Sequence, residues 1–174
     1  MKKLFINILI FSLFLNCLYA GNWPAWRGED ATGSTDSGNY PTELNLKKNL
    51  LWKASLPDKG CSTPIVWQDS IFLTCPINGE DGVLSFSLNG GKNWQTKMGP
   101  QRKGKHLNGS GSNPSLITDG RNLYALFKSG NLACLNRGGE ILWQKDLSSY
   151  GKDTLYWDFG TSPILSSKHV IVAL

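Results

Sequence analysis

Two segments of the chain, 99–110 and 148–160, concentrate side chains that can bind a ligand. The first contributes basic residues and the second contributes aromatic residues and an acid. They are Arg102, Lys103, Lys105 and His106, followed by Tyr156, Trp157 and Asp158. Such a mixture suits an anionic or polar partner, either a protein or a small ligand. The alternative is a solvated basic loop beside aromatic rings that fill an interface.

These residues do not form a recognisable catalytic or metal-binding pattern. After residue 20 the only histidines are His106 and His169, and no Gly-x-Ser-x-Gly motif, zinc-ligand spacing or phosphate-binding loop occurs. Glu80 and Asp81 lie between glycines, but two carboxylates fall short of the roughly six to eight oxygens that calcium prefers. A solvated turn is expected there. The sequence predicts no catalytic residue and no metal site.

Short β-strands are the elements that position the two segments. Between residues 111 and 147, four runs of apolar, β-branched and aromatic residues alternate with turn-forming clusters. The clusters at 119–122, 128–131 and 137–139 supply Gly and Asn, which tolerate the positive φ of tight hairpins. The pattern predicts a four-stranded antiparallel sheet.

The same pattern recurs along the chain. Pro64, Pro114 and Pro163 each open an apolar run and are 50 and 49 residues apart, and Trp94 and Trp143 are 49 residues apart. These five residues are the expected structural markers of the repeat. Four-stranded units with a period of about 40 to 50 residues are typical of a β-propeller, whose units stack face to face as blades. The predicted fold is all-β, with four-stranded antiparallel blades.

The repeat also predicts the domain organisation. Blades are expected at 61–99 and 111–148, with a partial blade at 160–174 and an N-terminal arm and linker at 21–49. Residues 50–56 match the later fourth strands, so they are expected to close the last blade of the ring. Because a propeller needs about four to eight blades, we expect an incomplete ring, a fragment of a longer protein. The alternative is a complete small protein that assembles through its open edges.

In a propeller, every link from a fourth strand to the next first strand crosses the same face of the disc. The segments 99–110 and 148–160 are both links of this kind. We therefore expect them to overhang one mouth of the central channel, where loops on a rigid scaffold commonly carry function.

Residues 1–20 have the pattern of an export signal. Lys2 and Lys3 precede a short apolar stretch that ends at Ala20, which predicts a signal peptide cleaved after that residue. The alternative is a lipid anchor at Cys17, which would be the only link to a membrane. We expect an exported protein, periplasmic or extracellular, at the cell envelope. Loss of the two lysines lowers the net charge from +5 to +3, and no nucleic-acid recognition motif accompanies this excess.

Three cysteines remain after the signal. Cys61 and Cys75 flank the first predicted hairpin, whose turn is centred near Gln68 and Asp69. A disulfide between them is one expectation in an oxidising compartment, and two free thiols are the other. Cys134 lies in a predicted strand, where we expect it to fill core space.

The repeat units resemble a known family. Residues 136–143 and 89–94 share the final Gly and Trp of the Ala-x-Asp-x-x-Thr-Gly-x-x-x-Trp motif of pyrroloquinoline-quinone (PQQ) type propeller repeats, with Asn in place of the Asp and Gly in place of the Thr. The arm at 23–28 is similar to the start of exported PQQ-binding-like propeller proteins. That group is similar to outer-membrane protein assembly factor B.

The resemblance implies a propeller that acts as a non-catalytic binding or interaction scaffold, with no cofactor predicted. Related quinoprotein dehydrogenases hold PQQ and calcium, but their adjacent cysteine pair is absent here. The alternative is a PQQ-dependent alcohol or sugar dehydrogenase whose catalytic centre lies in blades beyond residue 174. Its channel-facing loops would hold the quinone carboxylates through arginine or lysine.

Overall fold

The computed structural model describes residues 21–35, 38, 40–151, 154 and 156–174, so the predicted signal peptide and Cys17 lie outside the described residues. The first sheet consists of β1 (Ile65–Trp67), β2 (Ser70–Thr74), β3 (Glu80–Ser87) and β4 (Lys92–Pro100). The second consists of β5 (Ile117–Thr118), β6 (Asn122–Leu126), β7 (Asn131–Asn136) and β8 (Ile141–Asp146). A further hairpin consists of β9 (Ile164–Ser166) and β10 (His169–Ile171).

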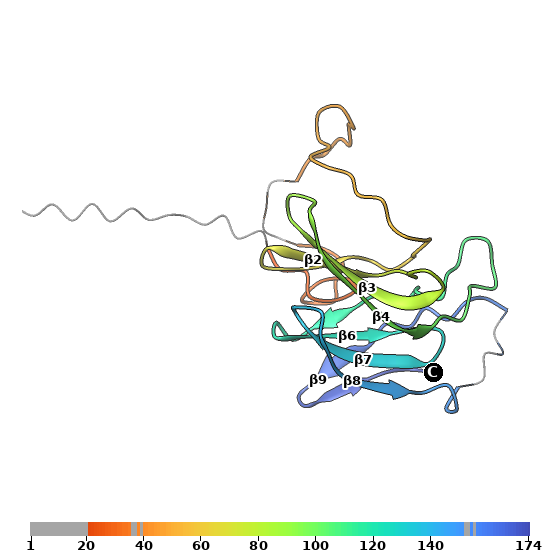
Figure 1. Cartoon of the computed structure of the whole chain (residues 1–174). Coiled ribbons are helices and arrows are strands. Elements are labelled where there is room, and N and C mark those ends of the chain that lie inside the picture. Colours follow the sequence, from red (N-terminus) through yellow and green to blue (C-terminus); the bar gives the residue numbers. More distant parts are fainter. Residues whose placement is uncertain (1–20, 36–37, 39, 152–153, 155) are drawn as a thin grey trace, which may run out of the picture.

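The strands are joined as antiparallel neighbours in chain order, and the described residues contain no helix. Figure 1 shows the first sheet stacked on the second, with the β9–β10 hairpin following the second. The predicted all-β fold of four-stranded antiparallel blades is confirmed. We refer to the two complete sheets as blade one and blade two.

The strand register shows that the two blades repeat residue by residue. One row across each blade contains an isoleucine, an aromatic residue, a small residue and a tryptophan. The rows are Ile65, Phe72, Ser85 and Trp94 in blade one, and Ile117, Tyr124, Cys134 and Trp143 in blade two. A bulge follows the third member of each row. Trp94 and Trp143 are therefore equivalent positions.

The first hairpin of each unit has the same length, because Ile65 pairs with Phe72, Ile117 with Tyr124 and Ile164 with Ile171. Its turn begins with a residue of positive φ in each case: Gln68 (55°), Gly120 (86°) and Ser167 (53°). Positive φ at this position matches the twist that a two-residue hairpin loop requires.

The three marker prolines are not all equivalent. Pro64 and Pro163 directly precede Ile65 and Ile164, whereas Pro114 lies three residues before Ile117. The position next to Ile117 is Leu116, which is fully buried in the core between the blades. The spacing of prolines in the sequence does not report how the strands are paired. A nearly constant proline spacing is therefore compatible with Pro114 lying two residues farther from its first strand than Pro64 and Pro163 do.

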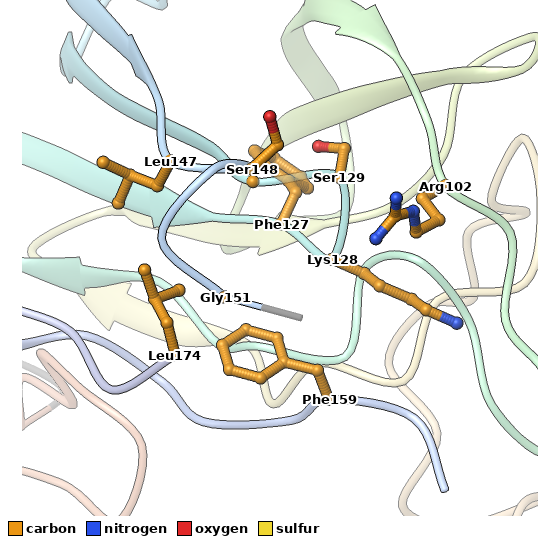
Figure 2. Close-up of a pocket in the computed structure, with 10 residues that line it drawn as sticks. Arg102, Phe127, Lys128, Ser129, Leu147, Ser148, Gly151, Phe159 and Leu174 are labelled. Carbon is orange, nitrogen blue, oxygen red and sulfur yellow. The ribbon is translucent and has the colours of Figure 1, made fainter. Parts of the chain in front are cut away.

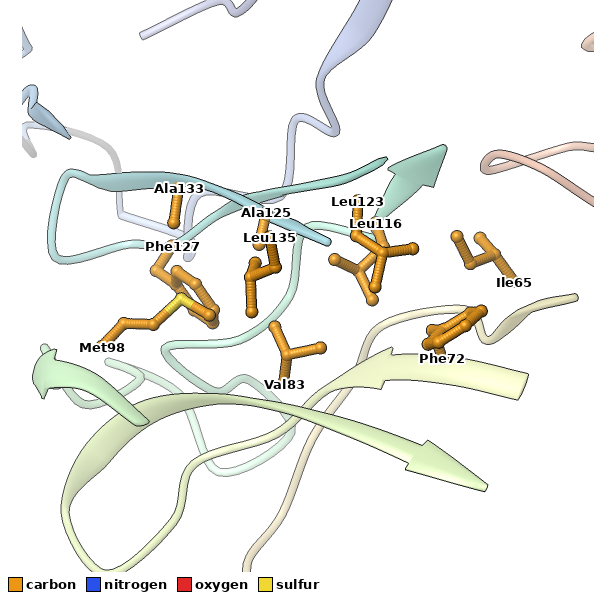
Figure 3. Close-up of a cluster of buried hydrophobic side chains, with 10 residues drawn as sticks. All are labelled: Ile65, Phe72, Val83, Met98, Leu116, Leu123, Ala125, Phe127, Ala133 and Leu135. Atoms are coloured by element: carbon orange, nitrogen blue, oxygen red, sulfur yellow. The ribbon is translucent and has the colours of Figure 1, made fainter. Parts of the chain in front are cut away.

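Two apolar clusters cover the two faces of blade one. Phe72 and Val83 belong to the cluster between the blades, together with residues of blade two such as Leu123 and Leu135 (Figure 3). The neighbouring residues Leu73 and Leu84 belong to a second cluster on the opposite face. Alternate strand residues point to opposite faces, so blade one is buried on both sides.

The blades are linked by tryptophan rings that cover glycines. Trp94 of β4 lies over Gly139 in the β7–β8 turn of blade two, and its indole Nε1–H donates to the Arg137 carbonyl at 2.9 Å. A Cβ at Gly139 would lie 2.7 Å from the Trp94 ring. This glycine also has a φ of 89°, so both the backbone conformation and the close ring require it.

Trp52 repeats this contact on the other face of blade one. Its Nε1–H donates to the Leu88 carbonyl at 2.7 Å, and its ring covers Gly90, whose φ is 87°. Residues 50–56 form no strand in the described structure. They nevertheless contact blade one in the way that the fourth strand of blade one contacts blade two.

The N-terminal arm runs beside the first strands of both blades. Trp23 exchanges two backbone hydrogen bonds with Val66 of β1, and the Pro24 carbonyl accepts from the Thr118 amide of β5. Trp26 is 54% exposed, with the Arg27 guanidinium over its ring. The arm therefore anchors through its backbone, and the Trp23 ring is half-buried against Gly28 of the arm itself.

Substituting Gly139→Ala tests whether the glycine–tryptophan contact holds the blades together. We expect a loss of about 2–4 kcal/mol in the free energy of unfolding, because strain at positive φ adds to overpacking against Trp94. The measurement is urea unfolding followed by tryptophan fluorescence.

Gly79→Ala is the matched control. Gly79 has a φ of 83° but nothing lies within 4 Å of a Cβ added there, so it reports the backbone strain alone, about 1–2 kcal/mol. Equal losses for the two variants would show that the Trp94 ring does not restrict position 139.

Candidate functional site

The residues singled out for binding lie on the two links between units, at the same end of the blades. Arg102, Lys103, Lys105 and His106 follow β4, and Tyr156, Trp157 and Asp158 follow β8. Figure 1 shows both links on one side of the stacked sheets. We call the surface formed by residues 101–110 and 156–160 the loop face.

Asp158 joins the two links. Its carboxylate accepts from the backbone amide of Lys105 at 2.8 Å and from that of His106 at 3.3 Å. A Cβ at Gly109 would collide with this carboxylate, so glycine is needed there. Burial acts to raise the pKa of Asp158, but the hydrogen bonds from Lys128, Lys105 and His106 outweigh it and hold the pKa below its usual range.

Lys128 completes this junction from the turn between β6 and β7. Its ammonium forms an ion pair with Asp158 and donates to the Lys103 carbonyl at 2.9 Å. The side chains of Lys128 and Asp158 are only 1% and 4% exposed. Asp158 therefore serves to connect the loops rather than to face a ligand. The sequence placed Lys128 in a hairpin turn, and nothing in that pattern distinguishes a buried turn lysine from a solvated one.

The link 101–110 is also fixed to the segment before blade one. The Lys59 ammonium donates to the Leu107 carbonyl, and the Cys61 thiol donates to the Asn108 carbonyl at 3.2 Å. With the contacts of Asp158, these bonds hold the loop on two sides. The loop face is thus a formed surface.

Three rings of the loop face contact one another. His106 and Trp157 lie edge to face with centroids 5.2 Å apart, and Tyr156 and Trp157 do so at 5.1 Å. Tyr156 is 79% and Trp157 61% exposed, so neither fills the interface between the units. Aromatic groups at this exposure are available to a partner.

Arg102 and Lys103 provide exposed cations. Within the part of the chain that the structure describes, neither side chain takes part in a hydrogen bond or ion pair. Arg102 lines a pocket of about 80 Å³ with Phe127, Leu147 and Phe159 (Figure 2). Lys103 lines a separate recess of about 380 Å³ with Lys59 and His106.

Asp81 is a buried carboxylate between the blades. It lies on β3 and accepts hydrogen bonds from the Ser129 hydroxyl and, at 2.9 Å, from the Asn131 amide of blade two. Its Oδ1 is buried without a hydrogen-bond partner. Burial raises the pKa of Asp81 to about 6, although the Ser129 and Asn131 hydrogen bonds act to lower it. The solvated turn expected for Glu80 and Asp81 is wrong at Asp81, because blade two covers it.

Cys61 and Cys75 are both free, so the disulfide alternative is not formed. The register of the first hairpin, extended from the Ile65–Phe72 pair, places Cys75 opposite Ser62 and not opposite Cys61. A difference of one residue sends side chains to opposite faces of a sheet. The Cys75 thiol donates to the Asp58 carbonyl at 3.1 Å, and its burial raises its pKa. Cys134 is buried in blade two.

The described residues contain no group of three or more His, Cys, Asp or Glu placed to hold a metal ion. No helix among them is long and apolar enough to cross a membrane. The pocket beside Arg102, at about 80 Å³, is far below the roughly 300–1,000 Å³ of typical cofactor sites. This pocket is too small for PQQ, whereas the recess beside Lys103, at about 380 Å³, falls within that range.

A protein-family model matches most of the chain. The model is described as Outer membrane protein assembly factor BamB, and it matches residues 42–173. The match includes both blades and both links of the loop face, and it begins within the predicted arm and linker at 21–49. No curated protein matches the chain.

A double-mutant cycle tests the junction between the links. Lys128→Met leaves the buried Asp158 carboxylate without its ion pair, so we expect a loss of about 3–5 kcal/mol in the free energy of unfolding. In an Asp158→Asn background Lys128→Met should cost much less, because the double variant contains neither of the two buried charges.

The exposed ion pair between Lys97 and Glu80, with side chains 40% and 36% exposed, gives the comparison. Lys97→Met is expected to cost about 0–1 kcal/mol. Additive effects of the Lys128 and Asp158 substitutions would contradict a coupled buried pair. Urea unfolding at neutral pH measures all of these variants.

Asp81→Asn tests the buried carboxylate through its pH dependence. Because the folded-state pKa is raised from 3.8 to about 6, protonation favours the folded protein, and this contribution is lost as pH rises through about 6. This rise in the pKa corresponds to about 3 kcal/mol in the free energy of unfolding. Asn resembles the protonated acid, so the variant should match the parent near pH 4 and exceed its stability by up to this amount at pH 7.

Urea unfolding of both proteins between pH 4 and pH 7 gives this difference directly. Taking the difference removes the opposite contributions of Asp119 and Asp158, whose pKa values are lowered. A difference that does not change with pH would show that burial at position 81 does not disfavour the carboxylate.

Proposed function

Because the chain belongs to the family described as Outer membrane protein assembly factor BamB, we propose that it is a non-catalytic propeller scaffold that binds another protein. We further propose that it is exported and acts at the cell envelope. The predicted signal peptide at 1–20 supports export. Processing at Cys17 would add a lipid anchor.

The single observation that carries the binding function is the construction of the loop face. Two links from different units are held together by the Asp158 carboxylate and the Lys128 ammonium. The surface that results exposes Arg102 and Lys103 on one link and Tyr156 and Trp157 on the other. A preformed surface loses little conformational entropy on binding, and Arg, Tyr and Trp are enriched at the centres of protein interfaces.

The role of residues 50–56 is a second part of the proposal. Trp52 contacts Gly90 and the Leu88 carbonyl as Trp94 contacts Gly139 and the Arg137 carbonyl. This equivalence supports our proposal that residues 50–56 act as the closing fourth strand of a blade that precedes blade one in the ring.

Nothing among the described residues favours the dehydrogenase alternative over binding. The basic side chains Arg102 and Lys103 could pair with carboxylates of any kind, whether on a quinone or on a protein. The small pocket beside Arg102 supports a side chain as the guest rather than a cofactor. The proposal therefore stays with protein binding.

Site-specific photocrosslinking tests the proposed function. A photoreactive benzoylphenylalanine at position 156 should form adducts with an envelope protein of the source cells. The same group at position 121, an exposed turn residue in the β5–β6 hairpin at the opposite end of blade two, should form few or none. Gel mobility and mass spectrometry identify the adducts.

The adduct from position 156 should disappear when excess unmodified protein competes for the partner. Equal crosslinking from positions 156 and 121, or no competition, would contradict a specific binding surface at the loop face.

A further inference from the structure

We infer that the loop face recognises an acidic peptide segment carrying a single aliphatic side chain. The inference rests on the proposed protein-binding function and names the chemistry of the partner. Its carboxylates would pair with the basic residues around the link 101–110. Its aliphatic side chain would enter the pocket beside Arg102.

The charge of the loop face gives the first argument. Lys59, Arg102 and Lys103 are exposed. Among the described residues, two acids near these cations are withdrawn from the surface, because Asp158 is paired with Lys128 and Asp81 is buried between the blades. Among the described residues that line the two recesses, Asp58 is the only exposed acid. A positive surface attracts carboxylates and disfavours basic partners.

Arg102 and Lys103, whose side chains have no bonding partner among the described residues, are placed to bind successive groups of a peptide. Arg102 and Lys103 are adjacent in sequence, yet Arg102 lines the smaller pocket and Lys103 lines the larger recess. An extended peptide directs its side chains to alternate sides. A peptide crossing the link at these residues can thus bring a carboxylate to each cation.

The pocket sets the size of the anchoring side chain. Its apolar wall consists of Phe127, Leu147, Phe159 and Leu174, and its volume is about 80 Å³. An apolar cavity of roughly 150 Å³ accepts a benzene ring, so this pocket suits a leucine- or valine-sized group and not an aromatic ring. Figure 2 shows the Arg102 guanidinium at the side of this pocket. A carboxylate next to the aliphatic residue would lie within its reach.

A concave site favours a peptide over a membrane surface. The aliphatic anchor and the two cations are used together only by a chain that enters the pocket and crosses the link. A lipid headgroup layer would meet the protruding rings of Tyr156 and Trp157, which are the most exposed aromatic groups of the loop face. The two classes of partner therefore depend on different residues.

Fluorescence anisotropy with a labelled probe peptide tests the inference. The probe is fluorescein-Gly-Asp-Glu-Leu-Asp-Glu-Gly, titrated with the whole protein at about 50 mM salt, where exposed charges are weakly screened. We expect saturable binding that the double variant Arg102→Glu/Lys103→Glu weakens by tenfold or more. Neither side chain bonds to the rest of the described structure, so the fold should survive. Circular dichroism and urea unfolding check this.

The matched control is Arg121→Glu/Lys168→Glu, which makes the same charge change in turns at the opposite end of the units. It should leave probe affinity within about twofold of the parent, since these charges lie away from the loop face. A probe with Gly in place of Leu should bind at least threefold more weakly. The inference requires both the unchanged affinity of the control variant and the weaker binding of the Gly probe, because the peptide is proposed to use the cations and the pocket together.

Three outcomes would overturn the inference. They are equal loss of affinity in the two double variants, equal binding of the Leu and Gly probes, or displacement of the probe by anionic phosphatidylglycerol vesicles but not by unlabelled peptide. Failure of the probe to bind while crosslinking from position 156 still captures a specific protein would reject the acidic peptide and retain the proposed function. Loss of that crosslink would instead reject the proposed function.

Discussion

The packing of a tryptophan ring against a glycine of the next unit is the contact on which the architecture depends. Trp52 covers Gly90 and Trp94 covers Gly139, each with its indole N–H on a carbonyl two residues before the glycine. The contact fixes both the distance and the rotation between neighbouring units. Because each sheet carries the same register and the same bulge, the links between units emerge at one end and can form a common surface.

A buried ion pair then holds those links together as the loop face. Lys128 lies in the β6–β7 turn of blade two, and its ion pair with Asp158 places a charge of each sign where little water reaches. Such a pair stabilises only when its remaining hydrogen-bonding groups are satisfied, as they are here by the Lys103 carbonyl and the amides of Lys105 and His106. The Asp158 carboxylate is used in this buried ion pair and is therefore not available to a partner at the surface.

Local patterns in the sequence sufficed for the strands of the two complete blades and for their tight turns, since alternation and turn-forming residues act within one hairpin. The contacts between units do not correspond to any local pattern in the sequence. Lys128 and Asp81 resemble ordinary turn residues until blade packing buries them. The positions of Cys61 and Pro114 in the sheets depend on strand register. Register can differ by one or two residues between units while the spacing of the residues in the sequence stays the same. The sequence assigned Asp158 to a link expected to face a ligand, but the inward orientation of its carboxylate depends on the buried Lys128 side chain.

The indole protons of the tryptophans give the most direct test of the stacking. In an NMR hydrogen-exchange experiment, the Nε1–H of Trp52 and Trp94 should exchange slowly, and the α-protons of Gly90 and Gly139 should be shifted upfield by the rings above them. The Nε1–H of Trp143, which is 36% exposed, should exchange quickly. Equal exchange of the three indoles, with random-coil shifts at both glycines, would contradict the stacking of units by tryptophan on glycine.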